Sequence, residues 1–89
     1  MARFEILIKR SAAKEIETIS RKKDRQPIVR KISQLAENPR PPGYQKLSGR
    51  DRYRIRQGSY RIVYSIEDDR LMVYVVKVGH RSDIYRGPL

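Results

Sequence analysis

The feature that most constrains the fold of this chain is a change in its apolar repeat, from helical spacing before Tyr44 to alternation after it. In the segment 52–56, Arg-Tyr-Arg-Ile-Arg, cationic and apolar residues alternate. Successive side chains of a strand point to opposite faces, so one face of this strand packs and the other carries three guanidinium groups. We therefore expect a sheet in the second half of the chain, with one cationic face.

Three strands are predicted in this half: Arg52–Gln57, Tyr60–Glu67 and Leu71–Val78. Tight turns at 58–59 and 68–69 join them into an antiparallel meander. The last strand is a nearly continuous apolar run, which is typical of a central strand covered on both faces. A further strand is expected at Arg3–Ile8, where apolar residues again alternate.

Two helices are predicted between the first strand and the meander. Ser11 is expected to cap the first helix, and the basic turn 21–23 to end it, where cations suit the negative end of the helix. The second helix is expected from about Gln26 to Glu37, with Pro27 in its first turn. The apolar stripes of the two helices are Ala12, Ala13, Ile16 and Ile19, and then Ile28, Ile32, Leu35 and Ala36.

This element order predicts an α+β fold, with an N-terminal strand, an α-helical hairpin and then a three-stranded antiparallel meander. The strands are expected to form one small sheet packed by two helices. Residues 1–89 are expected to form a single domain, because the sequence shows no internal repeat and no domain boundary.

The charge of the chain points to a polyanionic partner. Its 21 Lys and Arg outnumber 10 Asp and Glu, giving a net charge of +11, which suits nucleic acid first, an anionic membrane second and an acidic protein third. No apolar run approaches the ~18 residues of a spanning helix, and no signal peptide is evident, so a cytoplasmic location is expected. With no cysteine and one histidine, we expect no metal site and no cofactor.

Three motifs together resemble a known family. They are Lys46-Leu47-x-Gly49; Tyr53-Arg54-Ile55-Arg56 followed by Gly58-x-Tyr60-Arg61-Ile62-Val63-Tyr64; and Val78-Gly79-His80-Arg81-x-Asp83-Ile84-Tyr85. In order and spacing the chain resembles the RelE/ParE superfamily of toxins from type II toxin–antitoxin modules, and best its RelE-like, messenger-RNA-cleaving branch. The resemblance implies a RelE-like microbial RNase fold and cleavage of mRNA in the ribosomal A site. It also implies a RelB-like antitoxin that silences the toxin in a heteromeric complex.

The resemblance assigns catalytic roles to five residues. Arg54 and Arg56 lie where RelE-like toxins place two cationic residues, often lysines. Arg61 matches an arginine that binds phosphate, and Arg81 matches one that stabilises the phosphate or the leaving group. Tyr85 matches a C-terminal tyrosine that stacks on or orients the cleaved nucleotide.

Three further residues, Arg52, Lys46 and His80, are predicted to contact RNA. His80 could take part in proton transfer, since arginine stays protonated and is a poor base. Neighbouring residues on an extended segment point opposite ways, however, so His80 and Arg81 cannot easily face the same phosphate. In the simpler interpretation His80 is a polar residue at a strand end, and the arginines of 52–56 are a solvated strand face.

Two other functions remain open at this stage. A ParE-like toxin would keep the fold and bind DNA gyrase, although the tail from His80 to Tyr85 argues against it, because a gyrase binder needs no phosphate-facing arginine. A non-catalytic RNA- or ribosome-binding module would bind RNA in a salt-sensitive manner without cutting it.

Overall fold

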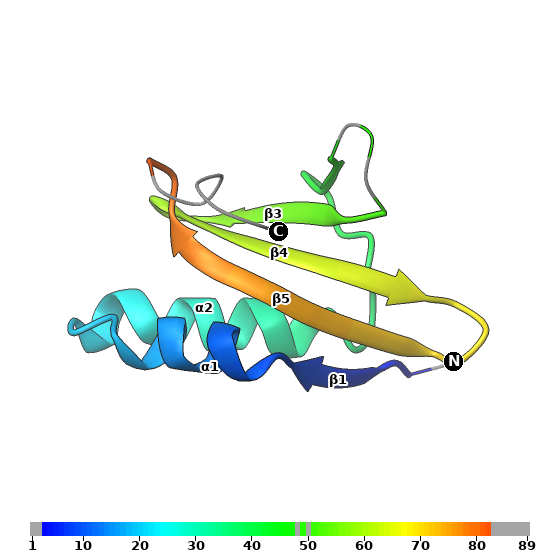
Figure 1. The fold of residues 1–89 in the computed structure, drawn as a ribbon, viewed down its shortest axis with the longest axis horizontal. Coiled ribbons are helices and arrows are strands. Elements are labelled where there is room, and N and C mark those ends of the chain that lie inside the picture. The colour runs from blue at the N-terminus through cyan, green and yellow to red at the C-terminus, as the bar shows by residue number, and fades with distance from the viewer. Residues whose placement is uncertain (1–2, 48, 50, 83–89) are drawn as a thin grey trace.

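The computed structural model describes residues 3–47, 49 and 51–82 and confirms the α+β fold (Figure 1). Its elements in chain order are β1 (Glu5–Ile8), α1 (Arg10–Glu17), α2 (Lys22–Gln34), β2 (Gln45–Lys46), β3 (Tyr53–Gln57), β4 (Tyr60–Glu67) and β5 (Met72–His80). Among the described residues, no helix is long and apolar enough to cross a membrane.

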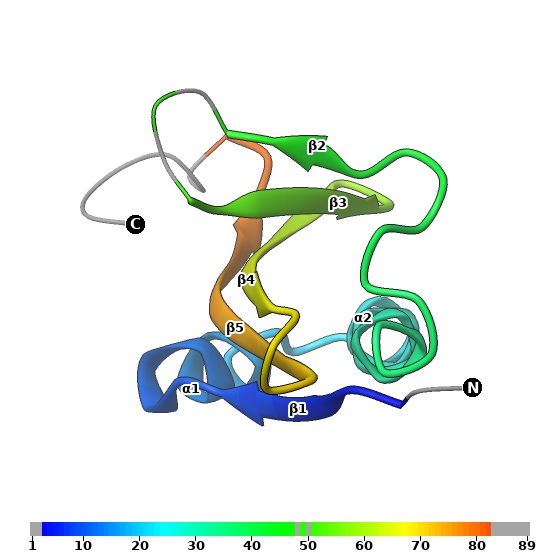
Figure 2. The same ribbon diagram turned by 90° about the vertical axis from the view of Figure 1, so that its right-hand side faces the viewer.

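The strands form one sheet in the order β1-β5-β4-β3-β2. The predicted meander is confirmed, since β3, β4 and β5 are antiparallel neighbours, while β1 runs parallel to β5. Figure 2 shows the strong twist of the sheet, and the helices pack on one of its faces, α1 against β5 and α2 against β4 and β3. The strand β2, which has only two residues, is too short to leave an alternating pattern in the sequence.

A bulge in β5 lets its apolar run serve both faces of the sheet. Tyr64 of β4 pairs with Val75 and Val63 pairs with Lys77, so that Val76 is the extra residue. The side chain of Val75 packs in the helix-covered core, whereas Val76 packs against Val63 on the other face. A bulge of this kind re-aims the side chains that follow it, and here it returns Val78 to the core.

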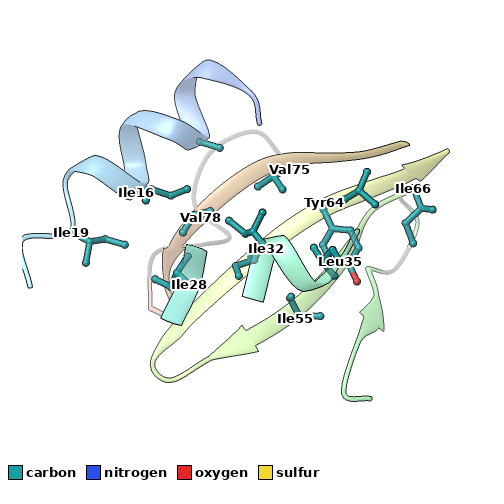
Figure 3. Close-up of a cluster of buried hydrophobic side chains, with 13 residues drawn as sticks. Ile16, Ile19, Ile28, Ile32, Leu35, Ile55, Tyr64, Ile66, Val75 and Val78 are labelled. Atoms are coloured by element: carbon teal, nitrogen blue, oxygen red, sulfur yellow. The ribbon is translucent and has the colours of Figure 1, made fainter. Parts of the chain in front are cut away.

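The core lies between the helices and one face of the sheet (Figure 3). The predicted apolar stripe of α2 is confirmed, because Ile28, Ile32 and Leu35 are at most 3% exposed. Full burial of each such side chain contributes about 1.5–3 kcal/mol relative to its exposed state. At the heart of the sheet Tyr64 is fully buried, and its hydroxyl donates a 2.7 Å hydrogen bond to the Pro39 carbonyl oxygen.

The predicted start of the first helix is wrong by two positions. Lys9, and not Ser11, is the N-cap residue of α1, and it makes no side-chain capping bond. The reason is the sheet: the Lys9 N–H donates to the Val75 carbonyl oxygen at 2.9 Å, and Ala13 already donates to the Lys9 carbonyl oxygen. The chain therefore turns into the helix directly after its last bond to β5.

The second helix also begins earlier than predicted. Arg21 is its N-cap residue, so the basic turn opens α2 instead of ending α1, and Pro27 lies inside the helix. Two contacts favour this start: Arg21 pairs with Asp24 at 3.8 Å, and the Arg25 guanidinium donates to the Ile19 carbonyl oxygen at 2.9 Å. Burial of Ile28 and the rest of the stripe then offsets the backbone hydrogen bond that proline cannot make.

Candidate nucleic-acid interface

The strand register places the predicted arginines on the face of the sheet that turns away from the helices. Ile55 pairs with Ile62, and both are buried in the core under the helices. The neighbouring residues in each strand point the other way. We call the resulting surface the arginine face, made up of Arg52, Arg54, Arg56, Arg61 and Lys77.

Two rows cross this face. In the first row, Arg54 of β3 pairs with Val63 of β4, and Val63 pairs with Lys77 of β5. In the second row Arg56 pairs with Arg61, and Arg61 pairs with Gly79, which adds no side chain beside the guanidinium. Like charges directly opposite one another in a sheet are destabilising, so the Arg56–Arg61 pair does not serve the stability of the fold.

Short contacts orient several of these arginines. The Arg54 guanidinium donates to the side-chain oxygen of Gln45 on β2, and Arg61 Nη1 donates to the Tyr60 carbonyl oxygen at 3.2 Å. Arg52 Nη1 donates to the Asp51 carbonyl oxygen at 3.1 Å, while its Nε is buried without a hydrogen-bond partner among the described residues. Arg56 is exposed, and the other arginines named here are half-buried, so the sheet restricts their movement.

Arg81 joins this end of the sheet through its backbone. Its N–H donates to the carbonyl oxygen of Ser59 at 2.8 Å, which holds the residue beside the turn between β3 and β4. The same turn connects Arg56 to Arg61. The structure thus gathers the backbone positions of three predicted catalytic residues around one turn, although Tyr85 lies outside the described residues.

Lys46 and His80 are not on the arginine face. Lys46 pairs with Tyr53, and His80 pairs with Tyr60, and both tyrosines pack against the core on the helix side. The His80 ring meets the Tyr60 ring edge-on, with centroids 5.8 Å apart, and its Nδ1 lies 2.8 Å from the Ser82 hydroxyl. Any contact of these two residues with RNA must therefore involve a second surface.

Lys77 was not among the residues predicted from the sequence. Its position inside the apolar run of β5 made it look like part of a buried strand, and only the bulge beside it brings it into register with Val63. A signal was present, because Lys77 is the only charged residue between Leu71 and Gly79. Among the described residues, no group of three or more His, Cys, Asp or Glu side chains could hold a metal ion.

These features define a basic α+β protein with a cationic sheet face suited to a polyanion. The model of the family described as "ParE toxin of type II toxin-antitoxin system, parDE" matches residues 6–85. The chain therefore belongs to this family of toxins, within the RelE/ParE superfamily.

Two similar proteins have names of the RelE type. A RelE-like toxin protein of Escherichia coli is 31% identical over 87 residues, which cover 93% of this chain and 90% of the relative. The mRNA interferase toxin RelE of Escherichia coli is 32% identical over 65 residues, or 68% of each chain.

Solved structures agree with the fold. The toxin of the intact Escherichia coli RelBE toxin–antitoxin complex superposes with a TM-score of 0.73 at 32% identity, covering 89% of this chain and 96% of that one. An archaeal RelE–RelB complex from Pyrococcus horikoshii gives a TM-score of 0.80, covering 93% of this chain and 99% of that one; at 24% identity it supports the fold alone.

Proposed function

We propose that this toxin is a RelE-like mRNA interferase, an endoribonuclease that cuts mRNA in the ribosomal A site without a metal ion. The observation that carries the proposal is the row Arg56–Arg61–Gly79, where two cationic positions converge beside a residue without a side chain. Its relative RelE, at 32% identity, is named an mRNA interferase. Such a protein would act in the cytoplasm, on translating ribosomes.

The chemistry needs no cofactor. The 2′-hydroxyl oxygen of one nucleotide attacks the adjacent phosphorus, and the bond from phosphorus to the 5′-oxygen of the next nucleotide breaks. The products are a 2′,3′-cyclic phosphate and a free 5′-hydroxyl. The planar fork of Arg61 can bind two phosphate oxygens, and fixed positive groups that meet developing negative charge are often the largest catalytic contribution. In this proposal Arg81 stabilises the leaving oxygen, and Arg54 and Arg56 hold the flanking phosphates.

Two proton transfers complete the reaction: one from the 2′-hydroxyl, the other to the departing 5′-oxygen. Arginine is a poor base, because it stays protonated. Lys77, an amine on the arginine face, and Tyr85, from the tail, are the candidates for these transfers. The ribosome would orient the strand for attack, and orientation alone can supply a large part of a rate enhancement.

The partner that silences the toxin is proposed to be a RelB-like antitoxin, since several similar solved structures are complexes of RelE with RelB. The surface offers it two kinds of contact. The arginine face suits acidic segments, and a hollow of about 250 Å³ between β1, α1 and α2 suits an apolar side chain. Near that hollow Ile8 and Val29 are 42% and 47% exposed, which leaves apolar area for a partner to cover.

A second candidate is inhibition of DNA gyrase, and the description of the matching family model as a ParE toxin favours it. A gyrase inhibitor would need a protein-binding surface, with no requirement for arginines aligned across two strands. The two functions therefore differ in what the arginine face must do.

The deciding experiment adds the purified protein to a translation extract and maps the 5′ ends of the transcripts. We expect cuts within translated codons, lost in Arg81→Ala and retained in Arg70→Ala. Arg70 is a suitable control because it is an exposed arginine that pairs with Glu67 at 3.8 Å, away from the arginine face. A supercoiling assay with gyrase runs in parallel. Intact transcripts together with blocked supercoiling would mean that the protein inhibits gyrase and is not a nuclease.

A further inference from the structure

A polar hollow lies at the end of the sheet that carries Arg56 and Arg61, on the face opposite the arginine face. It has a volume of about 290 Å³ and forms where the first turns of α2 face the last row of the sheet. The sheet contributes Gln57, Tyr60 and His80, which pair with one another across β3, β4 and β5. The helix side contributes Arg21 and Lys23. Nothing in the proposed cleavage reaction uses this hollow.

The lining has the chemistry of a nucleotide site. The rings of Tyr60 and His80 lie at 80° to one another and offer aromatic surface on which a base can stack. The Gln57 amide can both donate and accept hydrogen bonds at a base edge. Lys23 and Arg21 supply cations for a phosphate, and one charge is offset by Asp24, which pairs with Arg21 and also lines the hollow.

The size and polarity of the hollow narrow the choice of ligand. A volume of about 290 Å³ is close to that of the smallest small-ligand pockets, about 300 Å³, so the hollow suits one nucleotide and is too small for a protein helix. A purely apolar ligand is disfavoured, because four of the lining side chains carry or can carry a charge: Arg21, Lys23, Asp24 and His80.

The hollow lies one strand position away from the arginine face. Gln57 and Tyr60 are adjacent in sequence to Arg56 and Arg61, and the row they form lies next to the Arg56–Arg61 row but on the opposite face. Only the turn at Gly58 and Ser59 separates the two surfaces. A single strand of RNA held by the arginines can therefore pass this turn and continue directly into the hollow.

We infer that this hollow binds a neighbouring nucleotide of the same RNA strand, with its base against Tyr60 and His80 and its phosphate at Lys23. The inference rests on the proposed function, since it takes the arginine face to bind RNA. It gives His80 a role in holding the strand and none in proton transfer.

The test uses fluorescence anisotropy of the full-length protein with 2′-O-methyl RNA, which lacks the attacking hydroxyl and cannot be cut. Lys23→Gln is compared with Lys22→Gln, because both remove one charge from the first turn of α2 and only Lys23 lines the hollow. For an RNA of about eight nucleotides, we expect Lys23→Gln to weaken binding at least threefold more than Lys22→Gln and to lower the salt slope by about one phosphate. His80→Ala should weaken it about fivefold or more through lost stacking.

Two further comparisons decide the outcome. A dinucleotide is too short to reach both surfaces, so the wild-type protein should bind it much more weakly than the longer RNA. Asp24→Asn should strengthen binding of the longer RNA. Equal effects of the two lysine substitutions on the longer RNA, or no RNA binding by the wild-type protein, would overturn the inference. The inference would also be overturned if Lys23→Gln weakened binding of the antitoxin and left binding of RNA unchanged. Cleavage is measured separately. If transcripts stay intact while Lys23→Gln still weakens RNA binding, the proposed nuclease activity is wrong and the inferred nucleotide site is supported.

Discussion

Arg56 of β3 lies directly opposite Arg61 of β4, so two guanidinium-bearing residues face one another across an antiparallel pair of strands. Their charges are permanent at neutral pH and repel. Two like charges fixed opposite one another create a local positive field, and an anion bound there is attracted by both.

Replacing Arg56 should therefore separate stability from function. We expect Arg56→Gln to raise the free energy of unfolding by a few tenths of a kcal/mol, because it removes one of two like charges at a cross-strand pair. The same change should slow RNA cleavage. Urea denaturation and the translation assay measure the two effects, with Arg70→Gln as the control. A less stable Arg56→Gln protein would show that the arginine stabilises the sheet.

Substitutions at Arg61 test whether cleavage depends on the planar shape of the guanidinium or only on its positive charge. Arg61→Gln should reduce the cleavage rate by about 100- to 1,000-fold, the usual effect of losing one group that stabilises transition-state charge. Arg61→Lys keeps the charge and loses the planar fork, so its rate should fall between those of Arg61→Gln and the wild-type protein. Single-turnover cleavage of ribosome-bound mRNA measures both variants. Equal rates for the lysine and glutamine variants would mean that the fork, and not the charge, is what matters.

Tyr64 should be the most stabilising hydroxyl among the described tyrosines. Tyr64→Phe removes the 2.7 Å hydrogen bond and leaves the carbonyl of the buried Pro39 without its donor, which should cost about 1–3 kcal/mol. The control is Tyr74→Phe, whose side chain is 36% exposed. Thermal unfolding should show a lower melting temperature for Tyr64→Phe alone. Equal melting temperatures for the two variants would contradict the importance of this bond.

The extent to which the sequence predicted this structure depended on the range of the forces involved. Alternation predicted the meander and the face carrying Arg52, Arg54 and Arg56, because a strand's side-chain direction is a local property. The predicted starts of both helices were wrong, because long-range contacts decide where each helix begins. Before α1, the chain makes its last hydrogen bond to β5 from the Lys9 N–H to the Val75 carbonyl oxygen. These two residues are 66 positions apart in the chain, and their bond sets the first residue of α1.

The same distinction applies to the candidate site. The motifs named Arg61 and Arg81 as site residues, and in the structure their backbones lie beside one turn. Nothing in the local pattern indicated that Lys46 and His80 lie on the other face. Lys77 was missed because its register depends on the bulge at Val76, a feature of the packed sheet. Glu15 was missed for a similar reason: its side chain accepts the Val78 N–H at 3.0 Å, beyond the end of β1.

The Arg40–Asp68 pair should make the stability of the protein depend on acidity. The Arg40 guanidinium donates two hydrogen bonds, of 2.9 and 3.1 Å, to the Asp68 carboxylate, and these bonds hold the pKa of Asp68 below its ordinary value of about 3.9. Because the folded-state pKa is depressed, the contribution is present above the ordinary pKa and is lost as the pH falls through the folded-state pKa.

Asp68→Asn should therefore be less stable than the wild-type protein near pH 7, and the difference should shrink as the pH falls below about 4. Asp69→Asn is the matched control, since Asp69 is the next residue of the same exposed turn and no ion pair is described for it within 51–82. Urea denaturation of all three proteins near pH 7 and near pH 2.5 measures the effect. A stability difference between Asp68→Asn and the wild type that stays constant with pH would mean that the charge on Asp68 is not the source of stability. In that case the pair would tie the loop before β2 to the β4–β5 turn by packing and by hydrogen bonds that do not need a charged acceptor.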